Sequence, residues 1–488
     1  MKNKILNITI LIIFIIIALF VGAHHEPWAD EAQSWLIARD ASVLEILFEI
    51  ERYEGTPPIW HLLLKFLIVL GYKYEYLYLI SVFFSSLGVG LMLFKLDIPK
   101  PLKILLPFTY FFLYEYTVKA RSYCLILPTL VLIADTYKDR ENKPILYNFL
   151  LGLLATISLH TAIISGMLYI LELNEIFLKI TKEKNTEKYQ KEIWSMTILG
   201  IIYMLIIICV IPSPDVFVSI NALNFQEDSP LVVFMYLLAR FLEAFTLSIN
   251  YGIVQIVISA IFVSILLFAI LFKNKNSKLF ISIFVPLCLF LFFIRIATHH
   301  IGITFLTFLF CLYLSKESIV DKNKKVVTVM LIILAIIQII WSVNTIIPEI
   351  KYNYSASKEL SEYIKAMYYK DMKIYAFGYY PVAILPYFEE NIFFNDRGGT
   401  TYYKWSIQNP DWEKVIDKEK QYLESDLEGM PDIIILNDTL ANNNYDDLKE
   451  KVRNLEGYKE THFEGQAFYK QYSEDNEKEG YYVFERIK

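Results

Sequence analysis

The sequence contains few cysteines and no long basic stripe. The four cysteines all fall inside apolar stretches without the spacing of metal ligands, which argues against a disulfide framework or a thiolate zinc site. They are Cys124, Cys209, Cys288 and Cys311, and we interpret them as packing residues. No basic stripe with interleaved aromatic residues occurs, and the formal net charge is −6. No nucleic-acid partner is therefore expected.

Charged residues make up 20% of the chain, and apolar residues dominate. Hydrophobic residues make up 55% of the 488 residues, and the mean hydropathy is +0.40. This composition is too apolar for a soluble globular chain of this length and predicts a polytopic α-helical membrane protein. We predict about eleven transmembrane helices. They lie near residues 5–22, 73–94, 103–119, 122–137, 145–159, 161–179, 193–212, 251–272, 279–294, 301–315 and 326–347.

The first apolar run resembles a signal peptide, because Lys2 and Lys4 precede it and small residues end it. We interpret residues 5–22 as an uncleaved helix, since the run is longer than a usual signal segment and suits a bilayer core of about 30 Å. With Lys2 and Lys4 inside, every later lysine-rich connection also falls on the cytoplasmic side. We predict a multi-pass protein of the cell membrane with a cytoplasmic N-terminus and an extracytoplasmic C-terminus.

Two further apolar segments are not counted as spans. Residues 56–70 are short and begin at a double proline, which favours a helix at the interface. Residues 231–248 carry Arg240 and Glu243, and charges that face lipid are costly. We favour an interfacial helix there too, with a true span as the open alternative.

The composition changes after Pro348 from aliphatic runs to a charged, tyrosine-rich pattern. We predict a transmembrane domain over residues 1–348, with its first outer loop at 23–72, and a small extracytoplasmic α/β domain over 349–488. Its predicted strands and helix follow from alternation and helical periodicity. The strands lie near residues 372–377, 431–436, 466–472 and 481–487, and the helix near 357–369.

Polar residues with useful chemistry collect on the predicted outer side. The first outer loop contains His24, His25, Glu26, Trp28, Asp30 and Glu31. Later outer turns supply Arg121, Tyr123, His160, Arg295, His299 and His300. The coincidence of carboxylates, cations and aromatic residues on one side indicates an active site there.

Each of these residues also has a structural interpretation. Asp30 and Glu31 are typical of the first turn of a helix, where the helix dipole favours acids. Arg121 is placed to reach lipid headgroups, and His160 to pack between helices. The adjacent His299 and His300 should point to different helix faces.

Short motifs in the outer loops resemble those of the GT-C superfamily of membrane glycosyltransferases, in the branch with protein O-mannosyltransferases, aminoarabinose transferases and bacterial family 39-like enzymes. The pair Asp30-Glu31 and the stretch 54–60 (EGTPPIW) resemble that family's first outer loop. Residues 120–123 (ARSY) resemble its second outer loop, and 295–302, which end in HHIG, a later one. The chain departs from many relatives in having Gly55-Thr56, not a lysine, before the double proline.

The resemblance implies transfer of a sugar from a polyprenyl-phosphate donor to a lipid, glycan or protein acceptor of the envelope. Asp30, with Glu31 in support, would supply the general base that deprotonates the acceptor. Cations would hold the donor phosphate, whose negative charge grows as the sugar leaves. The expected phosphate ligands are Arg121, Arg295, His299 and His300, and the expected substrate contacts are Trp28, Glu54, Tyr123 and His160.

Several alternatives stay open. The stereochemistry is unspecified, and some members of the superfamily use a divalent cation while others do not. His24, His25 and Glu26 could bind a metal, although no further ligand spacing completes a site. The function could also be that of a lipid-linked glycan flippase, or of a polysaccharide polymerase or ligase of another polytopic class. Spans almost free of charge disfavour a transporter, and the acid pair directly after the first helix disfavours the polymerases and ligases.

Overall fold

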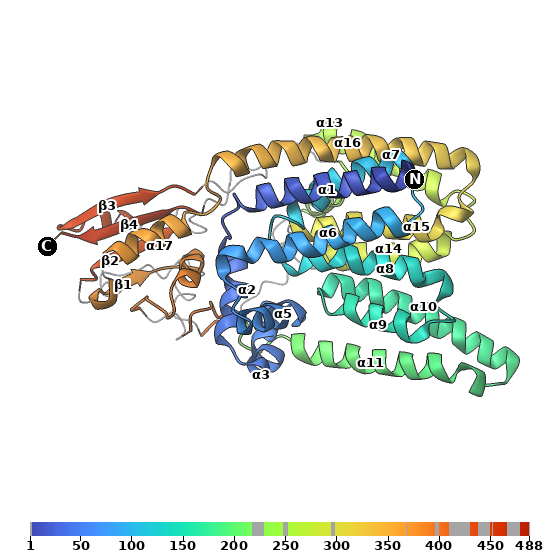
Figure 1. Ribbon diagram of the computed structural model, residues 1–488, viewed down its shortest axis with the longest axis horizontal. Coiled ribbons are helices and arrows are strands. Elements are labelled where there is room, and N and C mark those ends of the chain that lie inside the picture. The colour runs from blue at the N-terminus through green and yellow to red at the C-terminus, as the bar shows by residue number, and fades with distance from the viewer. Residues whose placement is uncertain are drawn as a thin grey trace. The chain divides into compact units, whose positions relative to one another are not determined.

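The computed structural model describes residues 2–216, 229–246, 252–293, 298–367, 369–395, 400–408, 430–437, 449–450, 452–465 and 479–487 (Figure 1). The chain divides into two compact units. The helical unit comprises Met1–Gly22, Tyr78–Val210 and Ser219–Asn344. The loop-and-tail unit comprises Ala23–Leu77, Ile211–Val218 and Thr345–Lys488. The predicted first outer loop therefore belongs to the same unit as the C-terminal segment.

Seven helices in the described residues are long and apolar enough to cross a membrane. They are α1 (Lys2–Gly22), α6 (Leu77–Lys95), α10 (Leu159–Glu183), α11 (Gln190–Val210), α13 (Ile253–Leu271), α15 (Thr298–Ser315) and α16 (Asp321–Lys351). The prediction of a helical membrane protein is confirmed at this level. Helix α16 continues through Pro348, where the sequence predicts a domain boundary.

The other four predicted spans form shorter helices. Three of them are α8 (Ile126–Thr136), α9 (Pro144–Ala155) and α14 (Ser277–Phe293). The stretch 103–119 is broken into α7 (Lys100–Leu105), a 3₁₀ turn η3 (Leu106–Phe108) and a π-helical turn η4 (Phe111–Glu115). Pro107 cannot donate a backbone hydrogen bond, and the Thr109 hydroxyl donates to the Leu106 carbonyl oxygen at 2.7 Å. Both features compete with a continuous α-helix.

The two uncounted segments are also helical. Helix α5 (Ile59–Val69) has 11 residues and α12 (Pro230–Glu243) has 14. At about 1.5 Å per residue, both are shorter than the hydrocarbon core of a bilayer. The Arg240 guanidinium donates to the Glu243 carboxylate at 2.7 Å, and both side chains are buried. This pairing offsets the cost of two charges in an apolar helix.

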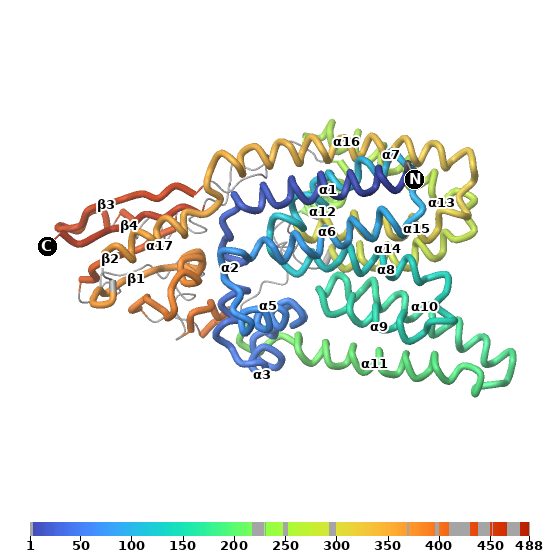
Figure 2. The backbone as a smooth tube through the Cα atoms, in the orientation of Figure 1, coloured from blue at the N-terminus to red at the C-terminus, as the bar shows by residue number. Residues whose placement is uncertain are grey.

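The helical unit is a bundle in which α9 packs against α10 and α11, and α14 packs against α10 and α15. Figure 2 shows these helices running side by side. Two aromatic rings tie the broken stretch to α16, because Tyr110 stacks on Trp341 with 3.5 Å between ring centroids. The helical unit also contains the short 3₁₀ turns η5 (Ser122–Leu125), η6 (Tyr137–Asp139), η7 (Glu187–Tyr189) and η8 (Lys316–Ser318), and the loop-and-tail unit contains η2 (Tyr74–Tyr76) and η9 (Tyr369–Asp371).

In the loop-and-tail unit, helix α2 (Ala29–Asp40) packs against α5 and against the 3₁₀ segment η10 (Tyr380–Tyr387). Between α2 and α5 lie α3 (Val43–Glu45), the π-helical turn η1 (Ile46–Ile50) and α4 (Glu51–Glu54). Apolar residues of α2 and η1, among them Ile37 and Ile50, form a small core there. Helix α2 thus has a fixed place among elements from both ends of the chain.

Among its described residues, the loop-and-tail unit also contains a four-stranded sheet in the order β1-β2-β4-β3. The strands are β1 (Ile374–Ala376), β2 (Ile433–Asn437), β3 (Tyr458–Phe463) and β4 (Tyr481–Arg486). The β1–β2 pair is parallel, and the other two pairs are antiparallel. Helix α17 (Ser357–Ala366) packs against η10.

Three of these strands overlap predicted ones, and α17 overlaps the predicted helix. Strand β3 was not predicted, because only its last residue is buried and its sequence (YKETHF) has no regular apolar alternation. The strand predicted at 466–472 lies outside the described residues.

Candidate functional site

The acid pair of the first loop lies in the first turn of α2, but its two carboxylates have different surroundings. Glu31 is fully buried, whereas Asp30 is half-buried. The Glu31 carboxylate accepts the backbone N–H of Trp28 at 3.2 Å and so satisfies one of the free donors at the start of α2. Glu31 therefore has the structural role typical of a first-turn acid, and Asp30 is the more accessible carboxylate.

Glu31 also belongs to a buried network centred on His25. The imidazole bonds Glu31 through Nε2 and Glu349 through Nδ1, both at 2.8 Å. Burial lowers the pKa of His25, but the two carboxylates outweigh burial and raise it from 6.5 to about 10. His25 is therefore a cation at neutral pH, and it ties the first loop to the end of α16.

Asp30 faces a group of aromatic side chains from the C-terminal segment. The Tyr379 hydroxyl donates to Asp30 Oδ1 at 3.0 Å. The Tyr379 ring centroid lies 4.7 Å from that of Trp405 and 5.5 Å from that of Tyr403. We call Tyr379, Tyr403 and Trp405 the aromatic cluster. It places large apolar ring surfaces directly beside a half-buried carboxylate.

Gln33 connects this region to Glu54. Its amide group donates to the Glu54 carboxylate at 2.8 Å and to the Tyr403 carbonyl oxygen at 2.7 Å. The Gln33 side-chain oxygen accepts the Tyr403 N–H at 2.8 Å. Burial raises the pKa of Glu54 to about 7, and repulsion from Glu51 and Asp30 adds to the rise. Asp30 and Glu54 therefore lie close enough to repel each other.

A further buried carboxylate comes from the far end of the chain. Glu479 accepts the backbone N–H of Ala29 at 3.0 Å and the Ser355 hydroxyl at 2.6 Å. It therefore caps the helix that carries Asp30. Burial raises the pKa of Glu479 to about 8, and the negative charges of Asp30 and Glu31 add to the rise.

The raised pKa values of the buried Glu479 and His25 predict that thermal stability falls as the pH rises. Because Glu479 binds its proton more tightly when folded, its contribution is complete below its ordinary pKa of 4.5 and is lost as the pH approaches 8. The contribution of His25 is complete below pH 6.5 and is lost as the pH approaches 10. Thermal unfolding of the purified protein should show a midpoint that declines from pH 5 to pH 9. A Glu479→Gln variant should decline less than wild type between pH 5 and pH 8; an identical slope would contradict this assignment.

In the helical unit, five predicted site residues lie together. We call Arg121, Tyr123, His160, His299 and His300 the histidine cluster. The half-buried Arg121 donates a long hydrogen bond of 3.4 Å to His299 Nδ1, and its guanidinium lies 5.4 Å from the Tyr123 ring centroid. Tyr123 stacks on His299 with 5.1 Å between centroids. Because Arg121 can only donate, Nδ1 accepts, and His299 Nε2 carries the ring hydrogen.

The remaining histidines extend the histidine cluster. His160 stacks on His300 with 4.2 Å between ring centroids, and His300 lies 4.1 Å from His299. Adjacent helix residues were expected to point to different faces, but both histidine rings lie near Tyr123, at 5.1 and 6.3 Å between centroids, and they stay together at the start of α15. His160 is buried, and its Nδ1 lies 3.2 Å from the Ser158 hydroxyl, as expected for a packing histidine.

Gly302 explains how the backbone of α15 can approach Tyr116 closely. A Cβ atom at Gly302 would clash with the rings of Tyr116 and Phe111. With glycine there, the Tyr116 hydroxyl donates to the His299 carbonyl oxygen. The HHIG motif therefore combines two imidazoles with the small residue that positions them.

The remaining predicted site residues are Trp28 and Arg295. Trp28 is half-buried beside Tyr354, with 6.1 Å between ring centroids, and is the residue before α2. Arg295 lies outside the described residues. No group of three or more His, Cys, Asp or Glu side chains that could hold a metal ion occurs in the part of the chain that the structure describes.

Sequence reasoning missed Gln33, Glu349, Tyr379, Tyr403, Trp405 and Glu479. Gln33 had a usable signal, because it lies three residues after Asp30 and thus on the same side of a helix. The others approach the first loop from more than 300 residues away in the sequence, so no local pattern links them to it.

The chain was compared with protein-family models, with curated proteins and with solved structures, and none of them matches.

Proposed function

We propose that this protein is an integral membrane glycosyltransferase. It moves a sugar from a polyprenyl-phosphate donor to a lipid, glycan or protein acceptor at the outer face of the cell membrane. The observation that carries the proposal is the half-buried Asp30 carboxylate, which is held by the Tyr379 hydroxyl beside the aromatic cluster. The motif resemblance to the GT-C superfamily supports the same reaction.

Asp30 is the base in this proposal. An acceptor hydroxyl or amine must lose a proton as it attacks the anomeric carbon, and a carboxylate within reach accepts it. Glu31 is buried and bonded to His25 and to Trp28, so its role is to fix the start of α2. This assignment narrows the acid pair to one catalytic residue and one positioning residue.

The aromatic cluster suits a sugar. Tyrosine and tryptophan combine an apolar ring with a polar group, which matches the apolar faces and hydroxyl rim of a pyranose ring. Tyr379 touches both Asp30 and the ring of Trp405, so a sugar packed on the aromatic cluster would lie near the base.

The histidine cluster suits the phosphate. Arg121 offers several N–H donors in a planar fork, and His299 Nε2 adds another. Charge-assisted hydrogen bonds to phosphate are stronger than neutral ones. They stabilise the negative charge that grows on the leaving polyprenyl phosphate.

Replacement of Arg121 by alanine tests this phosphate role. Loss of a charge-assisted hydrogen bond costs about 1.5–3 kcal/mol, so donor affinity should fall roughly 10- to 100-fold. The measurement is binding of a polyprenyl-phosphate sugar to purified protein. Arg140→Ala is the matched control, because Arg140 also lies over a tyrosine ring, that of Tyr137. Equal donor affinity in wild type and Arg121→Ala would remove Arg121 from the phosphate site.

A further inference from the structure

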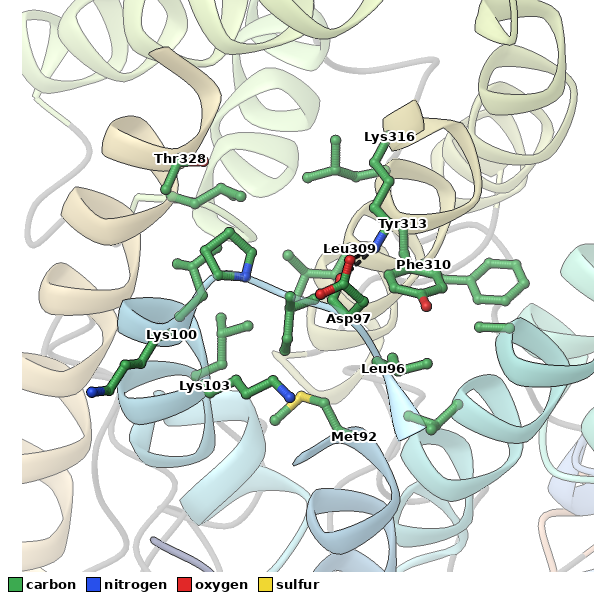
Figure 3. A pocket seen from close by; sticks show the side chains of 18 of the residues that line it. Met92, Leu96, Asp97, Lys100, Lys103, Leu309, Phe310, Tyr313, Lys316 and Thr328 are labelled. Carbon is green, nitrogen blue, oxygen red and sulfur yellow. Dashed lines mark hydrogen bonds and ion pairs between the residues drawn. The ribbon is translucent and has the colours of Figure 1, made fainter. Parts of the chain in front are cut away.

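The helical unit contains a cavity of about 740 Å³ that is separate from the histidine cluster (Figure 3). Its lining comes from α1, α6, α7, α8, α15 and α16. On α15 the lining residues run from Leu306 to Tyr313, whereas His299 and His300 are in the first turn. At about 1.5 Å per residue, Tyr313 is roughly 20 Å along the helix from His299. The cavity therefore lies toward the opposite end of α15.

Most of the wall of this cavity is apolar. Side chains from several helices contribute to it, including Met92, Leu130, Val131, Leu309, Phe310 and Leu331. Figure 3 shows Leu309 and Phe310 beside Asp97 in the centre of the view. An apolar space of this size among membrane helices suits hydrocarbon chains better than a polar solute.

Charged side chains also line the cavity, and the cationic ones outnumber the anionic ones. Four lysines, Lys100, Lys103, Lys316 and Lys324, line it together with two acids, Asp97 and Glu317. These six side chains have a formal charge of +2. The acids already have partners, because Lys316 contacts Asp97 and Lys138 contacts Glu317.

The lysines of α7 are the best placed to bind an added anion. Within the described residues Lys100 makes no ion pair, and it is exposed. Lys103 donates to the Leu93 carbonyl oxygen at 2.8 Å, which leaves two of its three N–H donors. Both lysines therefore have donors for an additional acceptor.

We propose that this cavity binds an anionic glycerophospholipid, with its phosphate at Lys100 and Lys103 and its acyl chains along the apolar wall. Basic pockets between transmembrane helices recognise anionic headgroups by this combination of charge and apolar surface. Glycerophospholipids are the most abundant lipids of a bilayer, so mass action fills a site of modest affinity with them. The site would draw lipid from the leaflet at the end of the bundle that carries the lysine-rich connections. This inference does not depend on the proposed glycosyl transfer.

Native mass spectrometry of the purified full-length protein tests the proposal. The probes are phosphatidylglycerol and phosphatidylethanolamine with identical acyl chains. Wild type should retain phosphatidylglycerol preferentially. Each lysine near the phosphate is worth about fivefold in affinity, so Lys100→Ala/Lys103→Ala should bind it on the order of 25-fold more weakly.

Two further variants distinguish binding in this cavity from a general electrostatic attraction to anionic lipid. Lys322→Ala/Lys325→Ala removes two exposed lysines that do not line the cavity, and it should bind phosphatidylglycerol like wild type. Leu309→Trp fills the cavity without a change of charge and should weaken retention as well. Equal binding by wild type and Lys100→Ala/Lys103→Ala would overturn the proposal. So would preferential retention of a polyprenyl monophosphate over phosphatidylglycerol, or displacement of the lipid by inorganic phosphate at equal concentration.

Discussion

The Asp30→Asn variant is expected to transfer sugar about 10²- to 10⁴-fold more slowly than wild type, the usual contribution of a general base. Asparagine has nearly the same shape as aspartate and can still accept the Tyr379 hydroxyl, which lies 3.0 Å from Asp30 Oδ1. Insertion into the membrane and protein abundance should therefore stay unchanged. The measurement is the initial rate of product formation by purified protein.

Asp40→Asn is the matched control, because Asp40 lies at the other end of α2, is exposed and pairs with Arg39. It should retain wild-type transfer. A full rate from Asp30→Asn would remove Asp30 from the mechanism. An equal loss in both variants would instead indicate that any charge change on α2 disturbs the unit.

The His25→Leu variant is expected to lower the free energy of unfolding of the loop-and-tail unit by about 3–5 kcal/mol. Removal of the His25 imidazole leaves the buried carboxylates of Glu31 and Glu349 without the cation between them. A buried charge without compensation is far more costly than the absence of the whole network. The measurement is the thermal unfolding midpoint of the purified protein near pH 7.

Two comparisons make this prediction specific. His24→Leu changes the neighbouring exposed histidine and should leave the midpoint near that of wild type. The triple variant His25→Leu/Glu31→Leu/Glu349→Leu removes all three charges and should recover most of the loss. If the triple variant were less stable than His25→Leu, the network would stabilise the fold through packing and not through charge compensation.

The helical class and most helix positions could be predicted from the sequence, because long apolar runs have few alternatives in a membrane protein. Helices α1 and α6 differ from their predicted ranges by only a few residues. The break in 103–119 was not predicted, because hydropathy averages over proline and threonine. Whether a proline breaks a helix depends on neighbours that can satisfy the freed backbone groups.

The candidate site was predictable only residue by residue. The members of the histidine cluster could be selected from the sequence, because they fall at short turns predicted to be outer ones and carry chemistry-bearing side chains. Adjacent residues of a helix point in different directions, so different surroundings for Asp30 and Glu31 are expected, but which of the two is buried was not predictable. Tyr379, which bonds Asp30, and Glu349, which shares His25 with Glu31, come from distant segments. Sequence alone identifies the pair, and packing decides which member is accessible.

Purified wild-type protein incubated with a panel of polyprenyl-phosphate sugars and an envelope extract as the source of acceptor, with products identified by mass spectrometry, tests the proposed reaction most directly. The account predicts that one donor yields free polyprenyl phosphate together with a glycosylated acceptor, and that the Asp30→Asn variant yields neither above background. Release of sugar at the same rate by wild type and Asp30→Asn, or no reaction of wild type with any donor and envelope extract, would contradict it.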